Sequence, residues 1–349
     1  MTNVSVLGCG YWGPNLVRNL KSATGCRVRK VCDLRAERLA YLKDMHPDVE
    51  VTQDFASVID SEDTDALVIA TPIKTHYPLA RLALLAGKHV FVEKPLATSV
   101  AECEELLSLA QDRSLVLMVG HTFVYSPTVR KIKEVVASGD LGEVIYISSR
   151  RLNLGLLQQD MNVAWDLAPH DISIILYVLG KMPLSVNCQG KAHVNPNVED
   201  VTNITLNFAN GGFAIIHNSW IDPRKVRETT IVGTRKMLVY DDIEPLDKMR
   251  IFDKCVEIPP HYDTFAEFTY SYHYGDMYVP YIKQVEPLKV ECQSFVDSIE
   301  TGVASDSDGR EGLKVVRILV AASESLKNNG ALVELGDGKR ADGKKAVTA

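Results

Sequence analysis

Short runs of apolar residues alternate with amphipathic stretches along the first third of the chain. Each run has a length typical of a buried parallel strand, in which both faces meet a hydrophobic layer. Such runs predict strands over residues 4–7, 28–32, 65–70, 88–92 and 115–119. The stretches between them predict helices over residues 14–21, 36–42, 77–86 and 99–112. Strands that alternate with helices of this length form a parallel, doubly wound sheet with right-handed crossovers.

The pattern changes after about residue 122. A strand is predicted over residues 141–147, followed by a helix that runs to residue 179. Further strands, separated by turns, are predicted over residues 184–194, 200–209, 212–220, 227–233, 236–241 and 249–253. They indicate a second sheet built from hairpins and meanders. Amphipathic helices are predicted over 288–301 and 310–328.

Length and composition fit two α/β domains, which we place at residues 1–122 and 123–335, with a disordered polar tail at 336–349. A net charge of −7 argues against nucleic acid or an anionic membrane as the partner. No apolar run approaches the roughly 18 residues that a membrane span needs, and no signal peptide precedes the first strand. The seven cysteines lack CxxC spacing. We therefore expect a cytoplasmic protein with reduced thiols and no metal site.

The first strand ends in the sequence GCGYWG at residues 8–13, which fits the pattern GxGxxG. In such a motif Gly8 permits a tight turn, Gly10 lets the backbone approach a pyrophosphate, and Gly13 lets helix and strand pack closely. The free N–H groups at the start of the next helix then face the phosphate charge. The motif predicts a Rossmann domain that binds a dinucleotide.

Asp33 ends the second predicted strand, twenty residues after Gly13. A carboxylate there can bind both ribose hydroxyls and repels a 2′-phosphate, which favours NAD over NADP. Arg35 and Arg38 lie close enough in sequence to keep NADP as an alternative. A second interpretation is that Asp33 only caps the helix that follows.

Ligands of doubly wound sheets bind at the carboxyl ends of the strands. The cofactor-binding residues that we predict at these ends are Gly8, Gly10, Tyr11, Trp12, Gly13, Asp33, Leu34, Arg38, Thr71, Pro72, His76, Glu93, Lys94 and His121. Lys94 follows a strand directly and can donate a hydrogen bond to a reacting oxygen. Pro95 after it allows a cis peptide. The alternative is an ordinary solvated lysine.

Asp166 and His170 are four residues apart, so in a helix they share one face. A carboxylate beside an imidazole can orient its tautomer and tune its pKa. Because proline favours the first turn of a helix, Pro169 predicts a helix that begins near residue 167 or 168 with Asp166 as its cap. The alternative interpretation is a capping aspartate next to an ordinary half-buried histidine.

These motifs together resemble the Gfo/Idh/MocA family of sugar and cyclitol oxidoreductases. The matching segments are GCGYWG at 8–13, ATPIKTH at 70–76, AGKHVFVEKPLA at 86–97, GDLGEV at 139–144, WDLAPHD at 165–171 and EPLKVECQSFVDSI at 286–299. The resemblance implies that Lys94, Asp166 and His170 are the catalytic residues. It also implies a C-terminal α/β domain with an open, mostly antiparallel sheet, through which the chain forms a homodimer or homotetramer.

The chain departs from many relatives in two places. Ala168 and Pro169 stand where a glycine and a small residue are common, and the segment HTFVYSP at 121–127 lacks an arginine that many members carry. These differences bear on the substrate more than on the reaction. The residues that we expect to contact the substrate are Lys94, Tyr125, Arg151, Asn153, Trp165, Asp166 and His170.

Within the family, WDLAPHDIS and the tyrosine-rich segment near residue 272 resemble nucleotide-sugar and aminosugar 3-dehydrogenases. The expected reaction is NAD-dependent oxidation of a sugar ring hydroxyl at C3, with a small-molecule sugar as the substrate. Alternatives are an NADP-dependent ketosugar reductase, an inositol-type cyclitol dehydrogenase, and a dinucleotide-bound sensor without catalysis. The tyrosines themselves predict either a stacking wall for a ligand or a sheet edge in a subunit contact.

Overall fold

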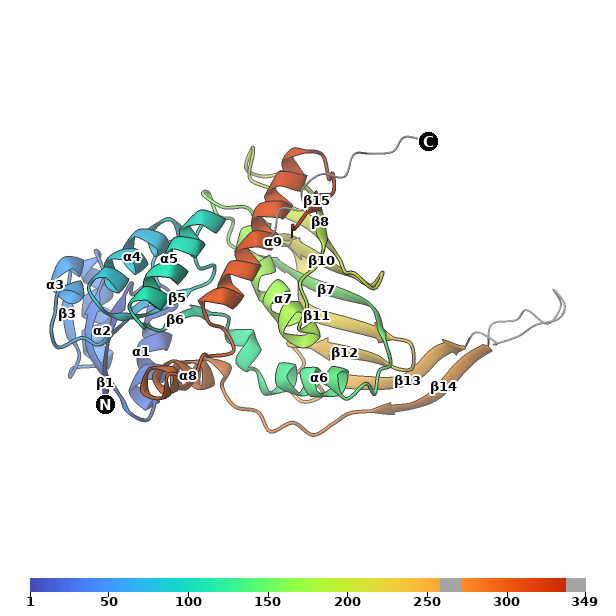
Figure 1. Cartoon of the computed structure of the whole chain (residues 1–349), viewed down its shortest axis with the longest axis horizontal. Coiled ribbons are helices and arrows are strands. Elements are labelled where there is room, and N and C mark those ends of the chain that lie inside the picture. The colour runs from blue at the N-terminus through green and yellow to red at the C-terminus, as the bar shows by residue number, and fades with distance from the viewer. Residues whose placement is uncertain (258–270, 337–349) are drawn as a thin grey trace.

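The structure is a computed structural model that describes residues 1–257 and 271–336. Two sheets stand next to each other along the long axis of the molecule, each with its own helices (Figure 1). The N-terminal sheet has six parallel strands in the order β3-β2-β1-β4-β5-β6. From β1 the chain adds strands first toward one edge of the sheet and then, from β4 on, toward the other. Doubly wound sheets bind their ligands at this reversal of strand order, here between β1 and β4.

The first domain contains every strand and helix predicted for it, together with one short strand, one short α-helix and a 3₁₀ turn at Ile73–Thr75. Its strands are β1 (Thr2–Leu7), β2 (Cys26–Cys32), β3 (Glu50–Thr52), β4 (Ala66–Ile69), β5 (His89–Glu93) and β6 (Leu117–Gly120). Its helices are α1 (Gly13–Ser22), α2 (Ala36–Met45), α3 (Phe55–Ile59), α4 (His76–Leu85) and α5 (Val100–Asp112). The elements absent from the prediction, β3 and α3, are too short to show a hydrophobic period.

The second sheet has nine strands in the order β14-β13-β12-β11-β7-β10-β9-β8-β15. Only β7 and β10 pair in parallel, and all other neighbours are antiparallel. The strands are β7 (Val144–Leu154), β8 (Ser185–Lys191), β9 (Val201–Asn207), β10 (Phe213–Ser219), β11 (Ile221–Gly233), β12 (Met237–Asp241), β13 (Met249–Glu257), β14 (Ser271–Tyr278) and β15 (Val333–Glu334). The predicted fold class, a Rossmann domain followed by an α/β domain with a mostly antiparallel sheet, is confirmed.

Helices α7 (Val163–Leu179) and α9 (Gly309–Lys327) lie over one face of this sheet, with α6 (Pro127–Ala137) at its lower end (Figure 1). Residues of α7, α9 and the strands form one hydrophobic core, which includes Ile172, Ile204 and Leu319. The helix α8 (Pro287–Thr301) instead packs on the first domain. Its Phe295 ring lies 5.6 Å from that of Phe91 in β5, within the core of the Rossmann sheet.

Helix α7 begins earlier than the sequence predicted. Asn162 is its cap, with its side-chain oxygen accepting the N–H of Trp165 at 3.2 Å. Asp166 therefore lies inside the first turn and is not the cap, and Pro169 is in the helix interior. The loss of one helical hydrogen bond at Pro169 is offset by burial of most of the apolar residues of α7, because tertiary packing overrides local preference.

The tyrosine-rich segment lies in part at the free edge of the second sheet. Tyr272 and Tyr274 of β14 are exposed, with ring centres 6.4 Å apart. The aromatic residues at 262, 265, 268 and 270, like the tail beyond residue 336, are outside the described residues. None of the helices in the described ranges has the length and apolar character needed to cross a bilayer.

Candidate active site

The glycine loop between β1 and α1 has the geometry of a phosphate cradle. Gly8 has φ +99°, and a Cβ atom there would lie 2.4 Å from the carbonyl oxygen of Ala70. A Cβ on Gly13 would lie 2.4 Å from the carbonyl oxygen of Gly8. A Cβ on Gly10 would meet only Arg35 Nη2, at 3.9 Å. Gly8 and Gly13 are thus required by packing, whereas Gly10 leaves the backbone open toward a bound pyrophosphate.

Asp33 is held by the same loop. Its Oδ2 accepts the N–H of Cys9 at 2.7 Å, and its Oδ1 accepts the backbone N–H of Arg35 at 2.9 Å and the side-chain Nε at 3.3 Å. Burial alone would raise the pKa of Asp33, but these hydrogen bonds hold it below its ordinary value. The carboxylate is therefore ionised and fixed beside the glycine loop. It does not cap α2, whose first residue follows Arg35.

The other predicted cofactor residues differ in exposure. Tyr11 and Leu34 are largely exposed, Trp12 is partly exposed, and Arg38 and Pro72 lie at the surface. His76 is buried, with its two ring nitrogens 2.8 Å from the carbonyl oxygens of Pro95 and Thr71. This imidazole therefore joins the end of β4 to the turn after β5, where the Lys94–Pro95 peptide is cis.

Two buried carboxyl groups lie near the end of β5. Burial raises the pKa of Glu93 to about 7, against the opposing effect of the Lys94 charge and N–H. Burial and the Glu93 charge raise the pKa of Glu291, on α8, well above its ordinary value. Glu291 Oε2 accepts the hydroxyl of Thr122 at 2.7 Å, and its Oε1 has no partner among the described residues. At neutral pH much of this carboxyl pair is protonated.

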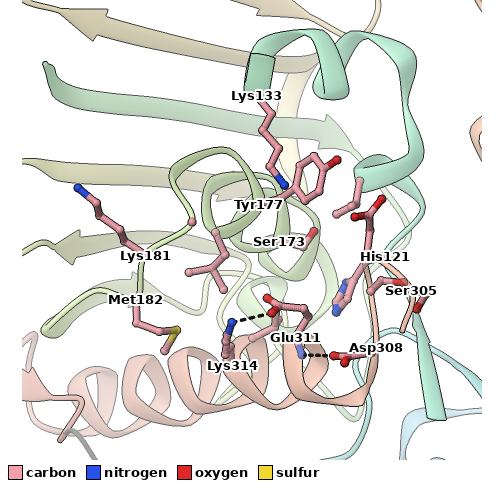
Figure 2. A pocket seen from close by; sticks show the side chains of 16 residues that line it. His121, Lys133, Ser173, Tyr177, Lys181, Met182, Ser305, Asp308, Glu311 and Lys314 are labelled. Atoms are coloured by element: carbon pink, nitrogen blue, oxygen red, sulfur yellow. Dashed lines mark hydrogen bonds and ion pairs between the residues drawn. The ribbon is translucent and has the colours of Figure 1, made fainter. Parts of the chain in front are cut away.

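His121, at the end of β6, is buried, and neither ring nitrogen has a partner in the described part of the chain. Burial and the Lys94 charge lower its pKa to about 3, so the ring is neutral. Figure 2 shows His121 on the wall of a cavity of about 450 Å³ near Ser305 and Glu311. The cavity is not lined by Lys94, Asp166 or His170, so it is separate from the predicted catalytic residues.

The predicted catalytic lysine and aspartate meet across the two domains. Lys94 Nζ donates to the main-chain carbonyl of Asp166 at 2.9 Å and lies 3.4 Å from its Oδ1. Both side chains are mostly shielded from solvent, at 15% and 25% exposure. The other carboxylate oxygen, Oδ2, accepts the indole N–H of Trp220 at 3.0 Å. The segment that carries Trp220 joins β10 to β11 in the second sheet.

His170 lies one turn further along α7 on the same side as Asp166. No hydrogen bond joins the Asp166 carboxylate to the imidazole in the structure, so the expected orientation of the ring by Asp166 is not observed. The ring instead packs edge-on against Phe123, with centres 5.1 Å apart. Burial and the charges of Lys94, Arg151 and Arg227 lower the pKa of His170 well below its ordinary value. The ring is therefore neutral at neutral pH, and the same environment makes it a weaker base than a solvated imidazole.

Besides Lys94 and Asp166, three of the predicted substrate contacts have partners within the protein. Arg151 is buried and donates to both carboxylate oxygens of Asp171, at 2.8 and 3.1 Å. The Tyr125 hydroxyl lies 3.0 Å from Ser307 Oγ in the interior. The Trp165 indole N–H donates to Ser323 at 2.8 Å. Asn153 is partly exposed near the end of β7. In this structure Arg151 and Tyr125 do not face open space.

Sequence reasoning missed Trp220 and Glu291. Both are distant in sequence from the groups they contact, with Trp220 54 residues from Asp166 and Glu291 169 residues from Thr122. The only local signal was a glutamate on the apolar face of the predicted helix at 288–301. That position conflicts with the pattern, because charged residues are rarely fully buried without a role or a partner.

A glycine loop shaped for a pyrophosphate, with a lysine–aspartate pair at the same edge of the sheet, defines an oxidoreductase that uses a dinucleotide. The chain belongs to the Gfo/Idh/MocA family. Residues 2–121 match the model of the oxidoreductase family with an NAD-binding Rossmann fold, and residues 129–239 match the model of the GFO/IDH/MocA C-terminal domain. The family predicted from the sequence is thus confirmed.

The named relatives include a nucleotide-sugar dehydrogenase and an inositol dehydrogenase. UDP-N-acetylglucosamine 3-dehydrogenase of Acidithiobacillus ferrooxidans is 29% identical over 73% of this chain and 76% of that protein. Myo-inositol 2-dehydrogenase of Thermotoga maritima is 22% identical over 93% and 96%. Among solved structures, GenD2 from gentamicin A biosynthesis in complex with NAD superposes with a TM-score of 0.80 at 22% identity, over 96% of each chain. At that identity the structural likeness shows the fold.

Proposed function

We propose that the protein is an NAD-dependent dehydrogenase that oxidises a ring hydroxyl of a sugar to a ketone. The contact between Lys94 and Asp166 carries this proposal, because it places a shielded cation from the Rossmann domain against α7 at the carboxyl end of β5. The glycine loop and Asp33 bind the cofactor at the same edge. The named relatives, a nucleotide-sugar dehydrogenase and a cyclitol dehydrogenase, support chemistry on a secondary alcohol.

NAD is the cofactor that the loop fits better. The Asp33 carboxylate is ionised and both of its oxygens are fixed, so it presents negative charge where NADP carries its 2′-phosphate. Arg35, which kept NADP as an alternative, pairs with Asp33 at 3.3 Å. Its charge therefore neutralises part of the carboxylate and does not stand free for a phosphate. When bound, the cofactor supplies the hydride acceptor.

The residues of the chain handle the proton and the developing charge. His170 is neutral and takes the proton from the sugar hydroxyl as general base. Lys94 donates a hydrogen bond to the oxygen as it gains negative charge. Asp166 holds the ammonium group of Lys94 through Oδ1 and its main-chain carbonyl. The ion pair, rather than the tautomer of His170, is the function that we assign to Asp166.

The substrate that we favour is a hexose unit oxidised at C3, in a nucleotide sugar or an aminosugar. The nucleotide-sugar relative supports this choice, and the inositol relative keeps a cyclitol as the second candidate. For the assembly, we propose a homodimer or homotetramer formed through the second sheet. Helices cover one face of that sheet, while Phe213 on the other face is 37% exposed and stacks on Tyr146 at 5.7 Å.

A substrate panel tests the proposal. UDP-sugars, sugar phosphates, free cyclitols and aminoglycosides are each mixed with NAD or NADP, and reduced nicotinamide is followed at about 340 nm, its ordinary absorption band. We expect NADH from one of these classes and little NADPH. A response of NADH fluorescence to sugars without turnover would indicate the sensor alternative instead.

Variants assign the roles. Lys94→Ala and His170→Ala should each lower kcat by about 10²–10⁴-fold, the usual contribution of one positioned acid–base group. The affinity for NAD, measured by fluorescence titration, should change little because Asp33 and the glycine loop remain. Wild-type kcat in both variants would refute the assignment.

A further inference from the structure

Trp220 is an aromatic side chain that the family resemblance did not single out, and it is 2% exposed. It lies between β10 and β11, where the chain passes from one strand to the next. Two hydrogen bonds hold the main chain of Trp220. Its backbone N–H donates to the carbonyl of Asp200 at 3.0 Å, and its backbone carbonyl accepts the N–H of Gly155 at 2.9 Å.

The anchor at Asp200 is itself rigid. The Asp200 side chain is buried, and its carboxylate accepts the backbone N–H groups of His193 and Val194 at 2.7 and 2.8 Å. Its other oxygen lies 2.7 Å from His193 Nδ1. These contacts hold the main chain of Trp220, and its indole ring is buried. The direction of the indole N–H is therefore set by the second sheet rather than by the active site.

That N–H meets the carboxylate that holds Lys94. Asp166 Oδ2 accepts the indole proton at 3.0 Å, and Oδ1 lies 3.4 Å from Lys94 Nζ. The terminal torsion of an aspartate is soft, so a carboxylate held by one long contact can rotate. With Oδ2 fixed by Trp220, the plane of the group keeps Oδ1 facing the lysine.

The chemistry of the donor matters as well. An indole N–H is a neutral group that can only donate. It therefore orients Asp166 without cancelling its charge, whereas a second lysine or arginine would compete with Lys94 for the carboxylate. The same indole fills a buried position, so water does not replace the contact.

We propose that Trp220 is a positioning residue that orients Asp166 and thereby places the Lys94 ammonium group against the reacting oxygen. Through Trp220 and Asp166, the second sheet sets the position of the Lys94 ammonium group, which comes from the Rossmann domain. This proposal rests on the proposed dehydrogenase function. It assigns to Trp220 no contact with substrate or cofactor.

The test compares Trp220→Phe with the wild type, using the sugar that the substrate panel selects. Hydrogen bonds to charged groups contribute enough that their loss lowers a rate by about 10- to 100-fold. We expect kcat to fall within that range while the NAD dissociation constant stays within about twofold, because the glycine loop is untouched. The deuterium isotope effect on kcat, with the substrate labelled at the oxidised carbon, should stay at or rise above the wild-type value as hydride transfer becomes slower.

The control is Tyr240→Phe. Tyr240 is also buried at 2% exposure, and its hydroxyl donates to Asp242 Oδ1 at 3.0 Å, so the variant removes a neutral donor from a carboxylate that contacts neither Asp166 nor Lys94. It should leave kcat within about twofold. A second variant replaces the Trp220 side chain with benzothienylalanine, which has the ring shape without the N–H. It should reproduce the loss in Trp220→Phe even if the smaller phenyl ring disturbs packing.

The outcomes are distinct. Normal kcat in the benzothienylalanine variant would overturn the positioning role, since it would show that shape alone suffices. An equal loss of kcat in Tyr240→Phe would overturn it too, by showing a general structural effect. Failure of the wild type to reduce NAD with any sugar would refute the proposed function instead. A crystal structure of Trp220→Phe should show a rotated Asp166 carboxylate, and an unchanged Lys94–Asp166 contact in an inactive variant would contradict the inference.

Discussion

At the scale of single residues, Glu93 is a buried carboxyl group whose ionisation destabilises the folded protein. It is 9% exposed, and burial raises its pKa from 4.5 to about 7. The folded state therefore holds a proton that the unfolded state has lost between these two values. The contribution of Glu93 to the free energy of unfolding is therefore most favourable below pH 4.5 and is lost as the pH rises toward 7, where the cost reaches about 3 kcal/mol.

We therefore predict that Glu93→Gln stabilises the protein in a manner that depends on pH. Its gain in the free energy of unfolding over the wild type should be about 2–3 kcal/mol larger at pH 8 than at pH 5. Urea unfolding of the protein without cofactor at the two pH values measures this difference. Glu291→Gln should shift the same way, because burial and Glu93 raise the pKa of Glu291. A gain for Glu93→Gln that is equal at both pH values would contradict the prediction.

Residues whose role depends on nearby sequence could be predicted from the chain. The three glycines lie in one turn, and Lys94 follows its strand directly, so each position follows from the local pattern. The partners of Asp166 could not be predicted in this way. Its i+4 neighbour His170 was the expected partner, but the carboxylate points to Trp220 and Lys94, which come from other elements. The hydrogen-bond partner of such a side chain depends on how segments that are distant in sequence pack together.

At the scale of elements, α7 contains a proline where a helix loses a hydrogen bond. Pro169 has no N–H, so the carbonyl of Trp165 lacks its usual donor one turn later. Proline also crowds the carbonyls of the preceding turn. The carbonyl of Asp166 belongs to that turn and accepts from Lys94 Nζ at 2.9 Å. The carbonyl that accepts from Lys94 thus lies one residue after the carbonyl that Pro169 leaves without its helical donor.

Replacing Pro169 with alanine should separate stability from activity. Removing the proline stabilises the folded helix by up to about 3 kcal/mol. It also makes the unfolded chain more flexible, which lowers the free energy of unfolding by up to about 1 kcal/mol, so the variant should be about 1–2 kcal/mol more stable. At the same time the loss of the proline ring should shift the Asp166 carbonyl relative to Lys94 Nζ, and kcat should fall several-fold. Thermal unfolding and steady-state kinetics measure the two effects. A more stable variant with unchanged kcat would show that the carbonyl contact has no catalytic role.

Strong periodicity made most elements predictable. Buried strands such as β4 and amphipathic helices such as α9 follow from their own residues, and the bounds of these two differ from prediction by one position at each end. The strands β7 and β11 extend six or seven residues beyond prediction at one end. The start of α7 did not follow, because the cap at Asn162 and the burial of the helix outweigh the preference of Pro169 for a first turn. The partner of α8 did not follow either. Its apolar face was visible in the sequence, but not that this face packs on the Rossmann sheet.

At the scale of the whole molecule, the chain crosses between the domains more often than a simple division at residue 122 suggests. After the second sheet it returns as α8, whose Leu288, Cys292 and Phe295 are part of the core of the first domain. The segment before α9 then adds to the edge of β6, where Ser307 O accepts the N–H of Val119 at 2.9 Å. Unfolding of the second half would therefore remove α8 from the core of the first.

This arrangement predicts a single cooperative unfolding transition for the two domains. With NAD at about 100 times its dissociation constant, the native state gains about 2.7 kcal/mol, which for a chain of this length raises Tm by about 4 °C. Because the domains share α8, the whole transition should move together in calorimetry. Phe295→Ala, in the second half of the sequence but in the first core, should lower that one transition without splitting it. Two resolved transitions, of which NAD shifts only one, would show instead that α8 and the β6 edge do not couple the domains. The positioning of Lys94 that we propose for Trp220 would then lack the rigid connection that it needs.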